Sequence, residues 1–390
     1  MTMADLKILA EKNHEYVVKM RRHFHKYPEI STQEKETSKR ICEELEAMGI
    51  PYHVYPDYTV VGVLDNGKGG KTVLIREDID ALPMKEETGA EYASVYDNAM
   101  HSCGHDAHAA MLLGVAKSLN EIKDEIPGKI LLGFQVAEEN LKGGRTLAKY
   151  VKELGGADHS ISVHVGCSEN VGQMKIVSGP FASGVITYRI IVKGKGGHGS
   201  VPHTAKDPIK PACELVLKLA SLPSNAIDAQ DPIVFSTCSI VAGTAPNIIP
   251  NEAVIMGTVR YFNKDLTQPI FDWLENISDC VCKSYGVERE MDYMFDPMIP
   301  VVNDPAATKI AQKVATEMGM EIFTEGKGMG SDDMAIVLDS FPGFYVNLGC
   351  ANEAKGFGHV ANHNSCFDID EDALVYGTEF LMKSAFELLK

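Results

Sequence analysis

The sequence lacks the features that mark secreted, membrane-bound and nucleic-acid-binding proteins. It has 37 lysine and arginine residues against 54 acidic ones, which gives a formal charge of −17. The sequence therefore lacks the clustered positive charge that holds a phosphate backbone. No run of about 18 apolar residues indicates a membrane span. The N-terminal stretch to Glu29 is charged throughout, without the apolar core and cleavage site of a signal peptide. We therefore expect a cytoplasmic protein that binds neither nucleic acid nor membrane.

The nine cysteines also lack a framework. Their number is odd and their spacing is irregular, which does not favour the paired disulfides of a small secreted domain. Most of them are expected to be reduced and to fill small apolar spaces. At 390 residues the chain is long for one hydrophobic core, so we expect two domains.

The first half of the chain alternates helices with strands. Helical periodicity runs from about Ala4 to Tyr27 and again over "TSKRICEELEAMGI", where Gly49 predicts the end of the helix. The β-branched runs "YTVVGVLD" and "KTVLIREDID" are joined by a glycine-rich stretch and predict a hairpin. The strands "GKILLGFQVA" and "ADHSISVHVG" then alternate with helices. This order predicts an α/β domain with a mostly parallel or mixed sheet.

From about Pro180 the pattern changes to strand, helix, strand, strand, helix, strand, which is the order of a ferredoxin-like α+β module. Within its first strand, apolar residues alternate with the other residues, so one face of this sheet should be buried. The later segment returns to helix, loop and strand. We predict that residues 1–179 and 295–390 form one domain and that residues 180–294 are inserted into it.

One short segment concentrates metal-binding side chains. Cys103 and His105 flank Gly104 in "HSCGHDAH", and a thiolate and an imidazole two residues apart can reach one metal ion from a loop. His108 lies one turn further on and is expected to pack or to support a ligand. On this segment alone, a capped helix with incidental histidines is an equal alternative.

Further donors follow the ends of strands. Glu138 and Glu139 come after an apolar strand, His164 ends "SISVHV", and His363 lies in a late loop. Ligands of such sheets gather beyond the carboxyl ends of the strands. Five donors exceed a closed structural zinc site and suit two adjacent divalent ions, with one glutamate left as a general base. The thiolate suits zinc, whereas carboxylates and imidazoles also suit manganese, cobalt or nickel.

Seven motifs of the sequence, taken in order, resemble those of a known family. They are "RRHFHKYPEIS", "REDIDALPM", "MHSCGHDAH", "FQVAEEN", "KGGHGSVPH", "GTAPNIIPNEAVIMGTVR" and "GSDDMAIV". The chain resembles the metal-dependent amidohydrolases that include hippurate hydrolases, N-acyl-amino-acid aminoacylases and auxin-conjugate hydrolases, a branch of the aminoacylase and carboxypeptidase superfamily. The resemblance covers essentially the whole chain. It implies a two-metal-ion enzyme that cleaves the amide bond of N-acyl amino acids or similar small conjugates.

The resemblance also implies roles for individual residues. Glu138 would be the general base that activates water held at the ions, and His198 would stabilise the oxyanion, often from the lid of a neighbouring subunit. Asp80 would orient a metal ligand, with Asp78 close by, and Asn247 and Arg260 would bind substrate, since a guanidinium forms a natural fork for a carboxylate. The implied metal ligands are Cys103, His105, Glu139, His164 and His363.

The same resemblance makes residues 1–179 and 295–390 the metal-binding catalytic domain and residues 180–294 a lid and dimerisation domain. It implies a small N-acyl amino acid as the partner and a homodimer or higher homo-oligomer. A short-dipeptide hydrolase on this scaffold and a non-catalytic metal- or solute-binding relative stay open. Two departures, Glu77 where a small residue is common and "GSDDM" for "GSEDF", leave the preferred acyl group open.

Overall fold

The chain divides into two compact units in the computed structural model, which describes residues 3–390. The first unit combines the chain up to Phe181 with Val302–Lys327 and Asp332–Lys390, and the second consists of Ala182–Val301 and Gly328–Ser331. Residues 295–301 belong to the second unit, in which Val185 and Met298 exchange two backbone hydrogen bonds. Over residues 3–390, no helix has the length and apolar character needed to cross a membrane.

The first unit has a central sheet covered by helices. Its helices are α1 (Met3–Lys26), α2 (Lys35–Met48), α3 (His105–Asn120), α4 (Gly143–Glu153), α7 (Pro305–Glu317), α8 (Met334–Ser340) and α9 (Ala373–Leu389). Its sheet strands are β1 (Tyr52–Val54), β2 (Val60–Asp65), β3 (Thr72–Asp78), β4 (Lys129–Gln135), β5 (His159–Asn170), β6 (Gln173–Lys175), β15 (Glu321–Phe323) and β16 (Gly343–Ala351). A separate two-stranded sheet pairs β7 (Gly179–Ala182) with β14 (Val301–Asn303).

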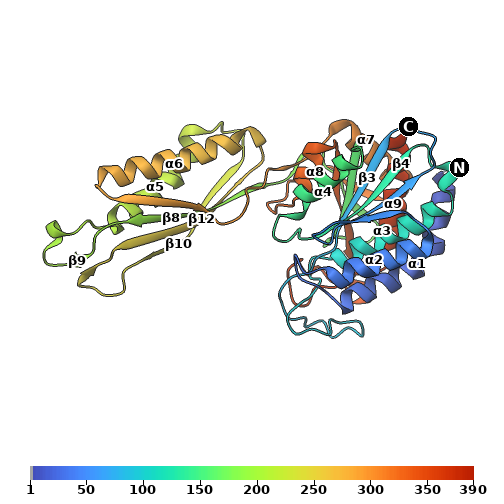
Figure 1. Cartoon of the computed structure of the whole chain (residues 1–390), viewed down its shortest axis with the longest axis horizontal. Helices are drawn as coiled ribbons and strands as arrows, with labels where there is room; N and C mark the ends of the chain where they lie inside the picture. The colour runs from blue at the N-terminus through green and yellow to red at the C-terminus, as the bar shows by residue number, and fades with distance from the viewer. Residues whose placement is uncertain (1–2) are drawn as a thin grey trace. The chain divides into compact units, whose positions relative to one another are not determined.

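The eight strands of the central sheet lie in the order β1-β2-β4-β3-β5-β16-β6-β15. β4, β3, β5 and β16 run parallel, whereas β2 is antiparallel to β4, so the predicted mixed α/β sheet is confirmed. Helices α2, α3 and α9 cover one face, with α1 packed against α3 and α9, and α4 and α8 pack together on the other face (Figure 1). The predicted end of the second helix is also confirmed, because Gly49 adopts φ 70° and caps α2.

The predicted hairpin between the second and third strands is wrong. Both runs are strands, but β4 lies between them and pairs with each. β4 is buried along almost its whole length, which favours a central place in the sheet. One glycine of the connection, Gly70, serves a close crossing instead of a hairpin turn. A Cβ at Gly70 would lie 2.7 Å from the carbonyl oxygen of Pro127, just before β4 begins.

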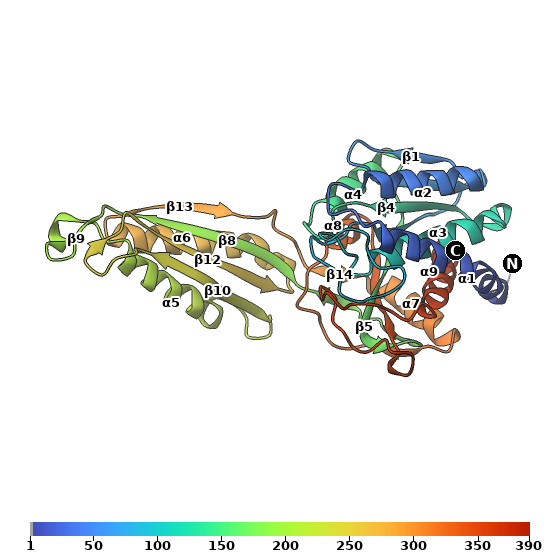
Figure 2. The same ribbon diagram turned by 90° about the horizontal axis from the view of Figure 1, so that it is seen from below.

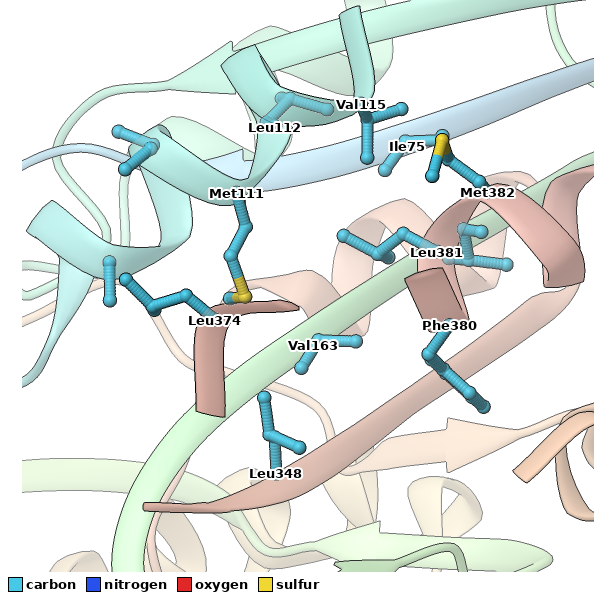
Figure 3. Packing of buried hydrophobic residues seen from close by; sticks show 14 of the residues in the cluster. Ile75, Met111, Leu112, Val115, Val163, Leu348, Leu374, Phe380, Leu381 and Met382 are labelled. Carbon is cyan, nitrogen blue, oxygen red and sulfur yellow. The ribbon is translucent and has the colours of Figure 1, made fainter. Parts of the chain in front are cut away.

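The core of the first unit lies between the sheet and helices α3 and α9. Figure 3 shows Met111 of α3 pointing toward Leu374 of α9, with Val163 of β5 and Leu348 of β16 close by. All four side chains are fully buried. Close packing of this kind fixes the start of α3, at His105, relative to the strand ends.

The second unit is a four-stranded antiparallel sheet with two helices. Along the chain its elements are β8 (Gly184–Lys193), β9 (Gly197–His198), α5 (Ile209–Ala226), β10 (Ile233–Ala242), β11 (Ile248–Ile249), β12 (Glu252–Tyr261), α6 (Thr267–Ser284) and β13 (Glu288–Tyr293). The strand order is β10-β12-β8-β13 (Figure 2), and β9 pairs separately with β11. Ile186, Tyr188 and Ile190 of β8 are buried with Leu215 of α5 and Leu274 of α6. The helices therefore cover the alternating apolar face of the sheet.

Candidate metal centre

The segment that leads into α3 is shaped by a glycine that no other residue could replace without strain. Gly104 adopts φ 90°, and a Cβ there would lie 2.3 Å from Cγ2 of Val165. Only glycine meets both conditions without strain. The tight backbone turns Cys103 and His105 inward, where the two residues are 8% and 0% exposed.

Three parallel strands deliver the other donors to one edge of the sheet. β4, β3 and β5 are neighbours. Glu138 and Glu139 follow the end of β4, and Asp80 follows the end of β3, whereas His164, which was expected to end its strand, lies in the middle of β5. His363 comes from a late loop whose backbone N–H donates to the carbonyl of Ser102 at 2.8 Å. Donors from four separate segments of the first unit thus meet at the carboxyl ends of the strands, where ligands of such sheets bind.

The donor atoms form two groups that share a sulfur. Cys103, His105 and His164 make one group, and Cys103, Glu139 and His363 make the other, with the donor atoms of each within 4.8 Å of one another. Cys103 Sγ lies 3.4 Å from His164 Nε2, and Glu139 Oε1 lies 3.4 Å from His363 Nε2. Ligands arranged tetrahedrally around one zinc ion are about 3.5 Å apart. The five side chains therefore have the spacing that ligands of divalent ions would need.

Two of these donor atoms make no hydrogen bond within the part of the chain that the structure describes, although each lies within 4.0 Å of a group of opposite charge. His105 Nε2 and Glu139 Oε1 are buried, and neither finds a hydrogen-bond partner among residues 3–390. Leaving such atoms unpaired away from water costs about 1–3 kcal/mol each. Burial raises the pKa of the Cys103 thiol to about 12, so the thiolate that ligates a metal requires a nearby cation. The residues present therefore fit a pair of divalent cations.

Asp80 connects two of the ligand-bearing segments. Its Oδ1 lies 3.1 Å from Nδ1 of His105, and its Oδ2 accepts the backbone N–H of Glu139 at 3.0 Å and the hydroxyl of Ser31 at 2.6 Å. Burial alone would raise the pKa of Asp80, but these partners outweigh burial and lower it. Asp80 is thereby held as a carboxylate beneath both ligands.

His108 is engaged by protein groups on both sides of its ring. Nε2 accepts the backbone N–H of Val165 at 2.8 Å, so Nδ1 carries the proton and donates it to Asp78 at 2.5 Å. Asp78 also pairs with the buried guanidinium of Arg76 at 2.7 Å. Neither nitrogen of His108 is left for a metal, in keeping with the supporting role expected for it.

Glu138 lies between the ligands and a second acidic cluster. It is 6% exposed, and one of its oxygens lies within 4.8 Å of oxygens of Asp332 and Asp333. Burial and these two carboxylates raise the pKa of Glu138 well above its usual value. Arg76 offsets the local negative charge, with Nη2 at 2.9 Å from Asp333 and 3.4 Å from Asp332. This cluster was not predicted from the sequence, although "GSDDM" and an arginine within an apolar strand could have indicated it.

The turn that carries Glu138 and Glu139 is strained at both ends. Ala137 adopts φ 57° and Leu141 φ 59°, conformations that cost about 1 kcal/mol or more outside glycine. The N–H of Leu141 closes the turn by donating to the carbonyl of Glu138 at 2.6 Å. Strain of this kind persists where the surroundings impose it, often at functional sites. Here it turns two adjacent carboxylates out of the end of β4.

Three predicted site residues belong to the second unit. His198 in β9 pairs with Ile248, and the carbonyl of Asn247 accepts the N–H of Gly199, so the structure brings His198 and Asn247 together. β12 begins at Glu252, shortly after Asn247 in the chain, and Arg260 lies eight residues further along this strand. Eight residues of extended strand span roughly 26 Å. Its Nη1 donates to Ser331 Oγ at 2.9 Å. Within the second unit, Arg260 therefore lies apart from the other two.

The sequence of residues 74–387 matches the family model described as Peptidase family M20/M25/M40. The chain belongs to this family. The resemblance drawn from the seven motifs is thereby confirmed, and so is the prediction that the chain is a hydrolase of this kind. The match spans both units and includes every predicted ligand.

Curated relatives in the M20/M25/M40 family extend over most of the chain. "Thermostable carboxypeptidase 1" of Saccharolobus solfataricus is 37% identical over 368 residues, which cover 93% of each chain. "N-acyl-L-amino acid amidohydrolase" of Geobacillus stearothermophilus is 37% identical over 302 residues, which cover 77% of this chain and 82% of that protein. Both relatives bear the names of enzymes that hydrolyse amide bonds.

A solved structure of the family shares the fold. The YXEP protein of Bacillus subtilis, described as a dinuclear metal binding peptidase from the M20 family, superimposes with a TM-score of 0.83 at 30% identity. The match covers 97% of this chain and 99% of that one. Two-metal binding is thus a property described for a relative of the same fold, and the donor groups above provide residues for it here.

Proposed function

We propose that this chain is a two-metal-ion amidohydrolase that cleaves the amide bond of N-acyl amino acids or similar small conjugates. The observation that carries the proposal is the position of Glu138. Its carboxyl group is buried within 4.8 Å of donor atoms of His105 and Glu139, yet it belongs to neither of the two groups that contain Cys103. A carboxyl group beside the ions but not needed to hold them has the placement of a general base.

Glu138 would act twice in the reaction. It takes a proton from the attacking water as the water oxygen bonds to the amide carbon, and the carbon–nitrogen bond then breaks. Glu138 returns the proton to the departing nitrogen, which releases an amine and a carboxylic acid, and the acid then gives its own proton to the amine or to solvent. Its raised pKa suits a group that must both accept and return a proton.

Cys103, His105, Glu139, His164 and His363 would hold the ions, with Asp80 orienting His105. Two divalent cations bound there would polarise the carbonyl oxygen and lower the pKa of water to about 7. Zinc suits the thiolate of Cys103, manganese suits the remaining donors, and cobalt and nickel are further candidates. These assignments rest on the donor groups of the first unit and on the motif resemblance.

The second unit would act as a ferredoxin-like lid and dimerisation domain inserted into the catalytic domain. Its element order β8-α5-β10-β12-α6-β13 and its strand order β10-β12-β8-β13 support a ferredoxin-like module. His198 would stabilise the oxyanion, from a neighbouring subunit of a homodimer, while Asn247 and Arg260 would bind substrate. Arg260 and His198 lie apart within the second unit, which is consistent with the two acting in different subunits.

A peptide substrate is the second candidate, because one relative that is 37% identical over 93% of the chain is named a carboxypeptidase. The two substrate classes share one chemistry, since the C-terminal residue of a peptide is itself an N-acylated amino acid. They differ on the acyl side. A screen of metal-reconstituted protein against N-acetyl, N-benzoyl and longer N-acyl amino acids, together with dipeptides, separates them by their kcat/KM values.

The mechanism is tested by variants of two neighbouring glutamates, one expected to lose hydrolysis but keep metal and the other expected to lose metal. Glu138→Gln should bind both equivalents of metal and lose hydrolysis by at least about 1,000-fold, because the proton acceptor is gone. Glu139→Gln should lose metal affinity, because it removes a ligand. Turnover that survives in Glu138→Gln would exclude Glu138 as the base, and a wild-type protein that binds metal but hydrolyses nothing would favour a non-catalytic relative. Activity that resists exhaustive chelation would favour Cys103 as a nucleophile.

A further inference from the structure

The link between α1 and α2 packs beneath the candidate site. Ile30 bridges to Ala81 in parallel register, and the N–H of Ala81 donates to the carbonyl of Glu29 at 2.8 Å. Ser31 reaches Asp80 through its hydroxyl. A few residues later, Glu34 is 0% exposed, although it lies in the polar stretch "STQEKE". A glutamate so completely buried needs a reason, because burial of a carboxyl group is costly.

Glu34 holds the strained residue that precedes the general base. Its Oε1 accepts the backbone N–H of Ala137 at 2.7 Å, and Ala137 is the residue with φ 57°. On the other side of Glu138, the N–H of Glu139 donates to Asp80 at 3.0 Å. Buried carboxyl groups from two different elements therefore fix the peptide N–H groups on both sides of Glu138.

Capping of α2 does not explain the burial of Glu34. Its side chain makes no capping hydrogen bond to α2, although the residue stands at the N-terminus of that helix. Glu29 does this instead, by accepting the backbone N–H groups of Glu36 at 3.1 Å and Thr37 at 2.7 Å. The buried Oε1 of Glu34 instead accepts a hydrogen bond from another segment of the chain, from the N–H of Ala137.

We propose that Glu34 is a positioning residue for Glu138: by holding the N–H of Ala137, it keeps the left-handed backbone that aims the Glu138 carboxyl group at the site. The proposal rests on the function proposed above for Glu138. A reacting group displaced by about 1 Å can lose about 100-fold in rate. Loss of a hydrogen bond one residue before Glu138 could displace its carboxyl group by a distance of this size.

The chemistry of Glu34 offers a conservative variant. Burial and the neighbouring carboxylate of Asp80 raise the pKa of Glu34 to about 8, so the group is largely protonated at neutral pH. Glutamine has the same shape as a protonated glutamate and keeps a carbonyl oxygen for the Ala137 N–H. Glu34→Gln should therefore preserve the contact, whereas Glu34→Ala removes it.

The experiment compares metal-reconstituted wild type, Glu34→Gln and Glu34→Ala by kcat, KM and amide hydrogen exchange in peptides that contain Ala137. For Glu34→Ala we expect kcat to fall about 10- to 100-fold, KM to stay within about twofold, and the Ala137 amide to exchange faster. Glu34→Gln should remain within about threefold of wild type in every readout. If Glu34→Ala does not fold, Glu34→Asp withdraws the carboxyl group by one methylene, and the same loss is expected of it.

Glu29→Ala is the matched control, because it removes a side chain of the same link that caps the N-terminus of α2. It should lower the melting temperature and leave kcat unchanged. An unchanged kcat in Glu34→Ala, an equal loss in Glu34→Gln, or a kcat loss without faster exchange at Ala137 would each overturn the proposal. Hydrogen exchange needs no substrate, so the contact is measured even if wild type hydrolyses none of the amides and the proposed function fails.

Discussion

Asp80 Oδ1 lies 3.1 Å from His105 Nδ1, and this contact decides which nitrogen of the imidazole faces the donor cluster. A proton on Nδ1 donates to the carboxylate and leaves the lone pair of Nε2 free. Nε2 is the buried nitrogen without a hydrogen-bond partner in the described chain. A carboxylate behind a ligating histidine fixes its tautomer and raises its basicity. Asp80 is not one of the predicted metal ligands, but through this contact it should influence how tightly the site binds metal.

Asp80→Asn should weaken metal binding while leaving the fold intact. The amide keeps the size of the side chain but loses the negative charge that steadies the Nδ1 proton, and changes behind a ligand typically cost about 10- to 100-fold in affinity. Competition with a chromophoric chelator measures the dissociation constants. Asp97→Asn, at a side chain that is 90% exposed, is the control and should bind like wild type. Equal affinities in the two variants would contradict the role of Asp80.

Gly104→Ala should damage the site far more than the same change at Gly172. The two glycines have nearly identical φ angles, 90° and 91°, and a left-handed φ costs alanine about 1–2 kcal/mol at either position. They differ in space, because a Cβ at Gly104 meets Val165 at 2.3 Å, whereas none of the atoms described lies within 4 Å of a Cβ at Gly172. Metal titration and thermal unfolding of both variants provide the comparison. Similar metal affinities would mean that the Val165 contact relaxes freely.

Local sequence signals predicted most elements of the first unit but not how its strands pair. Gly49 marked the end of α2 because a left-handed cap needs glycine, which is a local property. The pairing of β2 with β4 depends on which strand is apolar on both faces and can occupy the centre. Periodicity within β2 and β3 contains no information about that third strand. The hairpin prediction failed for this reason.

The same division applies to the candidate site. Cys103 and Glu138 were recognisable because a thiol beside histidines, and carboxylates after an apolar strand, are unusual locally. Glu34 was not recognisable, since a single glutamate in "STQEKE" is typical of an exposed helix start. Its burial arises only when the α1–α2 link packs against the turn at Ala137. Arg21 and His25 were overlooked similarly, because basic residues in the last turns of a helix usually face solvent.

Arg21→Met should destabilise the protein much more than Arg22→Met. The Arg21 guanidinium is 1% exposed and pairs with Asp106 at 2.8 Å and Asp368 at 2.6 Å. Its removal leaves the buried carboxylate of Asp106 with His25 as its remaining cationic neighbour, and breaking a buried ion pair in this way costs about 3–5 kcal/mol. Arg22 is 49% exposed and pairs with Glu371, a contact worth about 1 kcal/mol or less. Urea unfolding of metal-free variants measures the difference, and equal losses would argue against a buried charge requirement at Asp106.

His25 predicts how this buried network responds to pH. Its Nδ1 lies 2.7 Å from Asp106 and its Nε2 3.2 Å from Glu86, so both ring nitrogens face carboxylates. Burial and the charge of Arg21 lower the pKa of His25, but Asp106 and Glu86 outweigh them and raise it to about 8. The folded state therefore binds this proton more tightly than the unfolded chain, in which the pKa is about 6.5.

The stabilisation from His25 is accordingly complete below about pH 6.5 and is lost as the pH rises through about 8. A shift of this size corresponds to about 2 kcal/mol. We expect the difference in unfolding free energy between wild type and His25→Gln to shrink by that amount between about pH 6 and pH 9. Subtracting the variant at each pH cancels the titration of other groups. A difference that stays flat, or grows with pH, would mean that His25 is neutral in the folded protein and that Asp106 is neutralised by Arg21 alone.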